Sequence, residues 1–494
     1  MRPSPHPPAS RGVQRLGGLL AVVFCATTVP AEAQTTWDPA EWESITVTRF
    51  ARHVIPGVRW VGVLTEQGVL FYDRLREQWA VTVTPADGLP EGRATALWRQ
   101  ENGLFRYATA AEQVTIEPGT GRVRTAFPAS PPEAFSVPLP DNLYTDPSWQ
   151  YLPDGRLAGP LGVDAVITDS RTDGEGNLWI TTWGLGTGRA EENSRRLQMK
   201  PQGLWNADVR ALLIDGDTLL AAGYALSPAV GGLTEWRMRT DEWKHTLAFD
   251  EPGLLSDRVS AMVLADRDLW LATDAGLAHR DARGRWTQRG PRGLPDPRIT
   301  ALAAGAGGIW VGTMRGAAVA AGDSITLLPL LGPNRITDLA STPGAIWWAT
   351  EGGAWVWRGT WPEGRFDLIE HPTGALNGRI DAVCARGDTV WWGTTRGIVA
   401  GRPEAGEWLT VPASGPFLPG EITDLAVDDY NLWVTTFRGV RRLIRATGIW
   451  HYYTERDGLV DERVWRVVPR DGEAWFATAG GLTRFDWRQR RERP

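Results

Sequence analysis

The sequence predicts an all-β protein, a β-propeller built from four-stranded antiparallel blades. Three observations predict this fold. A motif recurs about every 40 residues, a strand pattern stands at a fixed distance before each copy, and a turn separates the units. The motif is clearest at 269–281, LWLATDAGLAHRD: apolar, Trp, apolar, small, Thr, two variable residues, Gly and a second apolar run. Two β-rich runs joined by a Gly-containing turn are typical of a hairpin.

Ten copies of the motif span the chain, each marked by the residue at its second position. From Trp179 onward the markers are 37–44 residues apart, except for one spacing of 50 residues that contains an insertion, 224–231, in a hairpin turn. The markers are Trp60, Phe105, Trp179, Leu220, Trp270, Trp310, Trp347, Trp391, Trp433 and Trp475.

A further strand is expected before each motif. Eleven residues before eight of the markers, seven residues are β-branched, as at the start of ITALAA (299–304) and ITDLAV (422–427). This inner strand, the two strands of the hairpin and an outer strand give four per unit. Such a unit cannot bury both faces alone, so the units are expected to stack into a ring.

The two ends of the chain predict how the ring closes. The last unit lacks its outer strand, whereas residues 36–48 resemble an outer strand without a unit of their own. Pairing the two removes exposed sheet edges. We therefore expect one ring of about ten blades over 34–494, with a Pro-rich excursion from the second blade at 126–160. The alternative is a ring of eight blades that starts near Val166.

The first 33 residues have the pattern of a signal peptide. Arg2, Arg11 and Arg15 form a basic region, residues 16–29 are apolar, and Ala31-Glu32-Ala33 is an A-x-A cleavage site. We expect cleavage after Ala33, a periplasmic or secreted protein, and no membrane span after cleavage, because no later run approaches about 20 apolar residues.

The net charge limits the classes of binding partner, and the cysteine content limits the possible disulfides. The chain has 52 Lys and Arg against 58 Asp and Glu, and cleavage would remove three Arg and one Glu, which leaves a net charge of −8. This balance argues against nucleic acid as a partner. Cleavage also removes one of two cysteines, so no internal disulfide is expected, and Cys384 is predicted to be a small core residue.

The repeat resembles the two-component-regulator propeller repeat, found in exported sensor regions of bacterial hybrid histidine kinases. The resemblance rests on GLPDPRITALAAGAGGIWVGTMRGA (293–317) and DGEGNLWITTWGLG (173–186); it is close over about 160–486 and weaker over 50–125. It implies a propeller that senses a ligand or acts as a scaffold, often in glycan uptake. No membrane helix or kinase follows here, so a sensed signal would pass to a separate protein, such as a membrane sensor.

Arginine recurs at positions that propeller geometry places at the mouth of the central channel. Directly before the inner strands stand Arg93, Arg258, Arg298, Arg335, Arg379 and Arg463, and in the turn after the motif Thr stand Arg315, Arg396 and Arg438. Converging guanidinium groups would bind a carboxylate, sulfate or phosphate. The alternative is that each arginine forms a structural ion pair with a neighbouring blade.

Other side chains of the repeat have structural interpretations. The marker Trp residues are expected to fill the wedge between blades, and the motif Thr to bond its turn. Asp173–Asn177 is interpreted as a turn rather than a calcium loop. The sequence contains none of the usual catalytic or metal-binding motifs, so no catalytic residue, metal or cofactor is predicted.

Two functional hypotheses follow. The first is a non-enzymatic ligand-sensing or protein-interaction module, whose partner is a small molecule, a glycan or another protein. The second is a propeller lyase or hydrolase that acts on a polysaccharide. Off-pattern His, Tyr or carboxylates on a single blade at the mouth would favour the enzyme, whereas off-pattern aromatic side chains across that face would favour binding.

Overall fold

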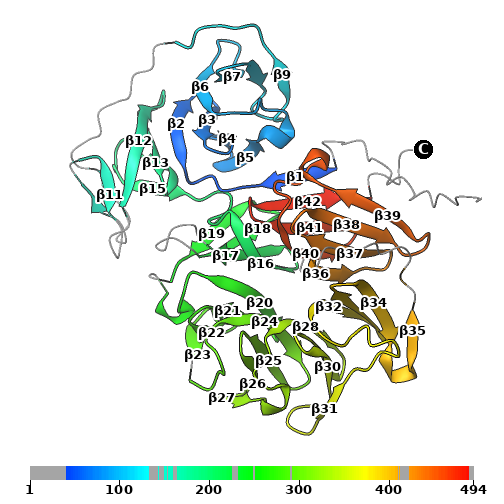
Figure 1. The fold of residues 1–494 in the computed structure, drawn as a ribbon. Coiled ribbons are helices and arrows are strands. Elements are labelled where there is room, and N and C mark those ends of the chain that lie inside the picture. The colour runs from blue at the N-terminus through cyan, green and yellow to red at the C-terminus, as the bar shows by residue number, and fades with distance from the viewer. Residues whose placement is uncertain are drawn as a thin grey trace, which may run out of the picture. The chain divides into compact units, whose positions relative to one another are not determined.

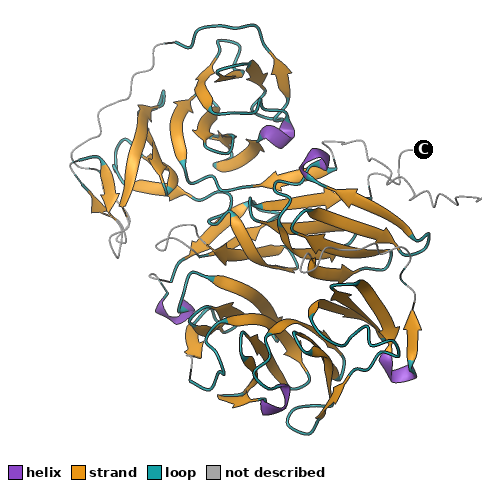
Figure 2. Ribbon diagram, in the orientation of Figure 1, coloured by secondary structure: helices purple, strands orange, loops and turns teal. Residues whose placement is uncertain are grey.

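The computed structural model describes residues 41–488, apart from 133–142, 144–149, 153, 159–163, 225–231, 249–250, 290–291, 410 and 412–421. The predicted signal peptide therefore lies outside the described residues. The strands form ten antiparallel sheets, nine of four strands and one of six (Figure 2). The helices of the described part are three-residue 3-10 turns, too short to cross a bilayer: η1 (Pro85–Asp87), η3 (Pro252–Leu254), η4 (Pro329–Leu331), η5 (Pro403–Ala405) and η6 (Glu455–Asp457).

Seven of the sheets form a closed ring (Figure 1). In ring order they are β16 (Asp208–Asp215), β17 (Thr218–Tyr224), β18 (Leu233–Arg237), β19 (Glu242–Thr246); β20 (Val259–Ala265), β21 (Asp268–Thr273), β22 (Gly276–Arg280), β23 (Trp286–Arg289); β24 (Ile299–Gly305), β25 (Gly308–Thr313), β26 (Gly316–Ala321), β27 (Ser324–Leu327); β28 (Ile336–Thr342), β29 (Ala345–Thr350), β30 (Gly353–Arg358), β31 (Arg365–Leu368); β32 (Ile380–Arg386), β33 (Thr389–Thr394), β34 (Gly397–Arg402), β35 (Glu407–Leu409); β36 (Ile422–Val427), β37 (Asn431–Thr436), β38 (Gly439–Ile444), β39 (Ile449–Tyr453); and β40 (Val464–Arg470), β41 (Glu473–Thr478), β42 (Leu482–Asp486), β1 (Trp42–Ile45).

The other three sheets form a group of their own. They are β2 (Ala51–Pro56), β3 (Trp60–Thr65), β4 (Val69–Asp73), β5 (Gln78–Val83); β6 (Ala94–Arg99), β7 (Phe105–Thr109), β8 (Gln113–Ile116), β9 (Val123–Thr125); and β10 (Gln150–Tyr151), β11 (Arg156–Ala158), β12 (Asp164–Thr172), β13 (Leu178–Trp183), β14 (Gly186–Ala190), β15 (Leu197–Lys200).

The repeat phase is confirmed in all ten sheets. Each predicted marker lies in the strand next to the inner strand: β3, β7, β13, β17, β21, β25, β29, β33, β37 and β41. The motif Thr bonds its own turn, as Thr313 Oγ1 does by donating to the Gly316 carbonyl over 2.7 Å. The same bond recurs in the other clear copies, from Thr273, Thr350, Thr394, Thr436 and Thr478.

The predicted closure by the N-terminal segment is also confirmed. β1 pairs antiparallel with β42, with Trp42 opposite Phe485 and Ile45 opposite Leu482. The Trp42 ring stacks on the Phe485 ring at 4.3 Å between centroids. The seventh sheet of the ring is thus completed by the strand that comes first in the described chain.

The expectation of a single ring of ten blades is wrong. The inner strands β16, β20, β24, β28, β32, β36 and β40 each pack on the next, and β40 packs back on β16. The strands β2, β6 and β12 pack on one another instead, with β2 between β12 and β6. The eight-blade alternative is also wrong, because Val166 lies in β12, outside the ring. The ring closes over 208–486 and β1, and residues 51–200 are inserted between β1 and β16.

The segment predicted as an excursion from the second blade joins β9 to the sheet that contains β12. Its described end contributes β10 and β11 to that sheet, which raises its strand number to six. The connection from β9 to this sheet must be long. The sheet of β12 follows the sheet of β6 in the sequence, but in space β12 packs on β2.

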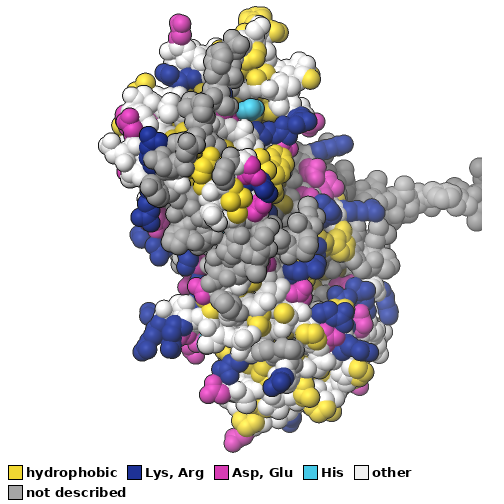
Figure 3. All heavy atoms as spheres, turned by 90° about the vertical axis from the view of Figure 1, so that its left-hand side faces the viewer, with side chains coloured by type: hydrophobic (Ala, Val, Ile, Leu, Met, Phe, Trp, Pro, Cys, Tyr) yellow, Lys and Arg dark blue, Asp and Glu magenta, His cyan; other side chains and the backbone are white. Residues whose placement is uncertain are grey.

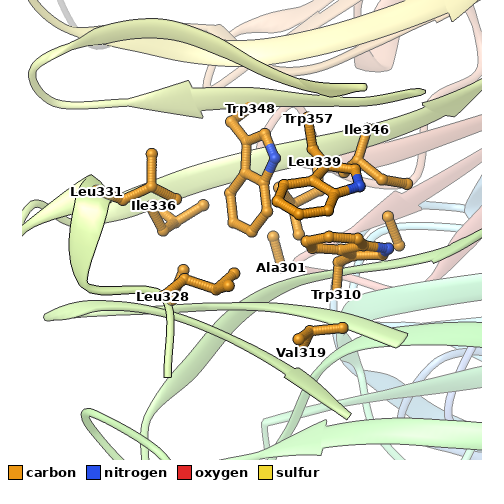
Figure 4. Close-up of a cluster of buried hydrophobic side chains, with 12 residues drawn as sticks. Ala301, Trp310, Val319, Leu328, Leu331, Ile336, Leu339, Ile346, Trp348 and Trp357 are labelled. Carbon is orange, nitrogen blue, oxygen red and sulfur yellow. The ribbon is translucent and has the colours of Figure 1, made fainter. Parts of the chain in front are cut away.

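The marker Trp residues fill the space between neighbouring sheets, as predicted. Trp310 of β25 is fully buried and meets Trp348 of β29 edge to face, with ring centroids 5.9 Å apart (Figure 4). The ring centroid of Trp357, in β30, lies 5.1 Å from that of Trp310. Broad aromatic rings suit a wedge-shaped space that widens away from the ring axis.

Candidate ligand site at the channel mouth

A β-bulge at the start of each of the seven inner strands of the ring builds the mouth of the channel. The bulge in β24 leaves Thr300 outside the ladder, and its hydroxyl donates to the Ile336 carbonyl of the next sheet over 2.6 Å. Ser260, Thr337 and Thr423 make the same bond to the first residue of the following inner strand. These hydroxyl groups join sheet to sheet around the mouth.

A cavity of about 490 Å³ lies at this mouth, and we call it the mouth cavity. Four of the predicted arginines line it: Arg258, Arg298, Arg335 and Arg379. They stand directly before β20, β24, β28 and β32, four consecutive sheets of the ring. The repeat position therefore does bring guanidinium groups together, over one arc of the ring.

Each of these four arginines has a carboxylate partner within its own sheet. The nitrogen–oxygen distances are 3.7 Å for Arg258–Asp274, 2.8 Å for Arg298–Asp296, 4.0 Å for Arg335–Glu351 and 2.6 Å for Arg379–Asp381. The expectation that a structural pair would cross to a neighbouring blade is thus wrong for these four. The pairs are local, and those of Arg258 and Arg335 are loose.

In the two tight pairs the carboxylates lie behind the guanidinium groups. The Arg298 side chain is 59% exposed and that of Asp296 only 6%, and the corresponding values for Arg379 and Asp381 are 46% and 2%. The hydrogen bond from Arg298 lowers the pKa of Asp296. The cavity surface there consequently presents donors, while the compensating charge is buried.

The other five predicted arginines are not among the described residues that line the mouth cavity. Arg463 stands at the same repeat position before β40 and pairs with Asp461 at 2.9 Å, and Arg93 precedes β6 in the separate three-sheet group. The turn arginines Arg315, Arg396 and Arg438 donate their backbone N–H to the motif Thr of their hairpins.

The aromatic side of the cavity was not predicted from the sequence. Tyr224 at the end of β17, Phe437 in the β37–β38 turn and Trp465 in β40 line it. The Arg210 guanidinium lies 3.5 Å from the centre of a Trp465 ring and pairs with Asp208 at 2.8 Å. Arg210 and Trp465 could have indicated it, because the same bulge position carries Ser, Thr or Asp in the other five sheets of the ring.

Arg466 forms the floor of the mouth cavity. Its guanidinium reaches from β40 to Asp424 of β36 at 3.1 Å and to Asp338 of β28 at 3.2 Å. These two carboxylates also accept from the backbone N–H of Val467 and Val383. Burial raises the pKa of Asp424 to about 6, against the opposing effect of Arg466.

Arg466 also lines a second cavity of about 380 Å³, beside Cys384 of β32. The thiol is buried, as the sequence predicted for a core residue, and burial raises its pKa. A thiol of this kind is a poor nucleophile at neutral pH. Arg466 thus separates the mouth cavity from the interior of the channel.

Asp381 departs from its equivalents in the ring. It occupies the bulge position of β32, where Ser260, Thr300, Thr337 and Thr423 carry hydroxyl groups that bond the next sheet. One of its oxygens, Oδ1, accepts from Arg379, but Oδ2 is buried without a hydrogen-bond partner. Burial raises the pKa of Asp381.

The predicted turn at Asp173–Asn177 is confirmed. Asp173 Oδ1 accepts from the backbone N–H of Glu175 and of Asn177, each at 3.0 Å, and Arg74 pairs with Oδ2.

Among the described residues, no group of His, Cys, Asp and Glu has an arrangement that could hold a metal ion. On the face drawn in Figure 3, basic and acidic side chains are interspersed.

Comparison with known proteins identifies the fold. No family model matches the chain, and no curated protein does. A similar solved structure is PorZ, an essential surface component of the type-IX secretion system of Porphyromonas gingivalis. The two share 16% identity over 88% of this chain and 68% of that one, with a TM-score of 0.51.

Two further solved structures match the chain with lower TM-scores. The extracellular domain of a putative hybrid two-component system from B. thetaiotaomicron shares 16% identity over 88% of this chain and 68% of that chain, with a TM-score of 0.46. Virginiamycin B lyase from Staphylococcus aureus shares 14% identity over 56% and 94%, with a TM-score of 0.44. The sheet topology and the similarity to PorZ define the chain as a β-propeller protein. Extracellular two-component regulator domains, which the repeat resembles in sequence, are thus among its structural neighbours.

Proposed function

We propose that the protein is an exported, non-enzymatic β-propeller module that binds a small anionic ligand in the mouth cavity. The observation that carries this proposal is that Arg258, Arg298, Arg335 and Arg379 converge on one cavity from four consecutive sheets. Guanidinium groups bind carboxylates and phosphates through directed, charge-assisted hydrogen bonds. The signal-peptide pattern supports export, and a separate membrane sensor is the kind of partner that would receive the signal.

The charge around the cavity favours a small ligand over a polymer. Each of the four arginines has its own carboxylate, so the cluster as a whole carries little excess charge. Long-range attraction of a polyanion needs a surface of one sign. What the cavity offers is a set of local donors, suited to one or two anionic groups.

The off-pattern side chains support binding rather than catalysis. Three aromatic residues, Tyr224, Phe437 and Trp465, come from three different sheets, which is the distribution expected of a binding surface. The carboxylates that line the cavity, Asp274 and Asp381, are each paired with an arginine. They belong to different sheets, β21–β22 and β32, and not to a single catalytic blade.

Calorimetric titration of the mature chain with inorganic phosphate and with benzoate tests the proposal. The double variant Arg298→Gln/Arg335→Gln should weaken the binding of the better probe at least tenfold. Arg463→Gln is the matched control, because Arg463 holds the same repeat position, pairs with an Asp two residues earlier and is 60% exposed, but does not line the cavity. Equal affinities in the double variant, the control and the unmodified protein would overturn the proposal.

A further inference from the structure

The mouth cavity has a cationic side and an aromatic side. Around the ring, four successive sheets supply Arg258, Arg298, Arg335 and Arg379, and the remaining three supply Phe437, Trp465 and Tyr224. Because the ring is closed, residues of one arc face those of the other across the channel. A ligand that fills the cavity therefore meets guanidinium groups at one end, and at the other end aromatic rings beside Arg210 and Arg466, which already pair with Asp208 and with Asp338 and Asp424.

Arg335 is the arginine best placed to receive an anionic group. It lies between Arg298 and Arg379 in ring order, and the carboxylate with which it forms an ion pair, Glu351, is 4.0 Å away. Its Nε atom is buried and has no hydrogen-bond partner. Because this pair is loose and the side chain is 39% exposed, the accessible nitrogens of the Arg335 guanidinium can donate to an anion in the cavity.

Phe437 is the aromatic side chain best placed to receive an apolar ring. It is 43% exposed, although it meets Trp465 edge to face with ring centroids 5.3 Å apart. The Arg210 guanidinium already lies over Trp465, and it also approaches the Tyr224 ring at 5.1 Å. Phe437 thus keeps an exposed ring surface in the lining of the mouth cavity.

We propose that the ligand is a small organic acid whose anionic group is attached to an apolar ring, with the anion on Arg335 and the ring on Phe437. This inference rests on the proposed anion site and adds the second half of the ligand. The cavity of about 490 Å³ is within the range of small-molecule sites, roughly 300–1,000 Å³. Aromatic rings prefer edge-to-face or offset contacts, which Phe437 can offer on its exposed part.

Paired titrations with benzoate, cyclohexanecarboxylate and acetate test the inference. Benzoate and cyclohexanecarboxylate should bind at least tenfold more tightly than acetate. Phe437→Ser should weaken benzoate binding roughly five- to tenfold, the loss expected of one aromatic contact, and leave acetate unchanged. Phe127→Ser, on an exposed side chain of the three-sheet group, is the control. Phe437→Leu retains an apolar side chain and should lose less than Phe437→Ser.

The outcomes separate the two proposals. If acetate and benzoate bind equally and both depend on Arg335, the anion site stands and the ring-binding inference is wrong. If benzoate binds but Arg335→Gln has no effect, both proposals fail. An unchanged melting temperature in the Phe437 variants excludes unfolding as the cause of a loss.

Discussion

Replacement of Asp381 by threonine should stabilise the ring, because it restores the hydroxyl that joins one sheet to the next. In the preceding sheet, Thr337 donates to the Ile380 carbonyl over 2.6 Å. Asp381 occupies the equivalent position in β32 and leaves Oδ2 buried without a partner. The threonine hydroxyl should reach the Ile422 carbonyl at the start of β36, as its equivalents reach theirs.

The expected gain in the free energy of unfolding is about 1–4 kcal/mol. A new hydrogen bond contributes about 0.5–1.5 kcal/mol, and removal of an unsatisfied buried oxygen relieves about 1–3 kcal/mol. Against this stands loss of the pair with the half-exposed Arg379, about 0–1 kcal/mol. For a ring of this size the gain corresponds to a rise in melting temperature of at least about 2 °C.

The gain should depend on pH. Burial raises the pKa of Asp381 in the folded state, so the folded protein binds this proton more tightly than the unfolded chain does. The stability that the protonated Asp381 carboxyl contributes to the wild type is fully present below the pKa of Asp381 in the unfolded chain. It is lost as pH rises through the pKa of Asp381 in the folded protein. The advantage of Asp381→Thr should be largest near pH 7 and shrink toward pH 4.

Calorimetry of the wild type, Asp381→Thr and Thr337→Val over this pH range measures the effect. Thr337→Val removes the equivalent hydroxyl from the neighbouring sheet and should cost about 0.5–1.5 kcal/mol at every pH. A lower melting temperature for Asp381→Thr at pH 7, or a gain that does not change between pH 4 and pH 7, would refute the reasoning.

Two further predictions concern the closure and the floor of the ring. Trp42→Ala should lower the free energy of unfolding by about 3–5 kcal/mol in chemical denaturation, because it empties a buried site against Phe485; an unchanged midpoint would contradict closure by β1. Arg466→Met should cost about 3–5 kcal/mol at pH 7, because it leaves Asp338 and Asp424 buried without a counter-charge. Since burial raises the pKa of Asp424 to about 6, protonation should reduce this loss at pH 5, and equal losses at the two pH values would contradict that account.

Much of the fold was predictable because the repeat is local. The inner strand starts eleven residues before Phe105, at Ala94, just as it starts eleven residues before Trp310, at Ile299, and both markers lie in four-stranded sheets. For the same reason the sequence could not separate the three-sheet group from the ring. The predicted pairing of 36–48 with the last unit, which the structure shows for Trp42–Ile45, specifies that a ring closes, but the number of sheets in the ring depends on β40 packing against β16. That contact joins residues with no distinctive local pattern.

The candidate site was predictable to a similar degree. The repeat position identified Arg298 and Arg335, but it also selected Arg463, which lies outside the cavity lining. Arg298 and Arg463 both follow an Asp by two residues and form the same local pair, so only their surroundings distinguish them. The aromatic side was visible as departures from the pattern, since Trp465 stands where other copies carry Ser, Thr or Asp.

The most direct test of the anion site is a crystal structure of the mature protein with 4-iodobenzoate, whose iodine can be located by its anomalous scattering. The account predicts an iodine peak in the mouth cavity, with the carboxylate on Arg335 and the ring against Phe437, and the loss of this peak in Arg298→Gln/Arg335→Gln crystals. An iodine peak elsewhere on the protein, with the mouth cavity empty, would contradict it.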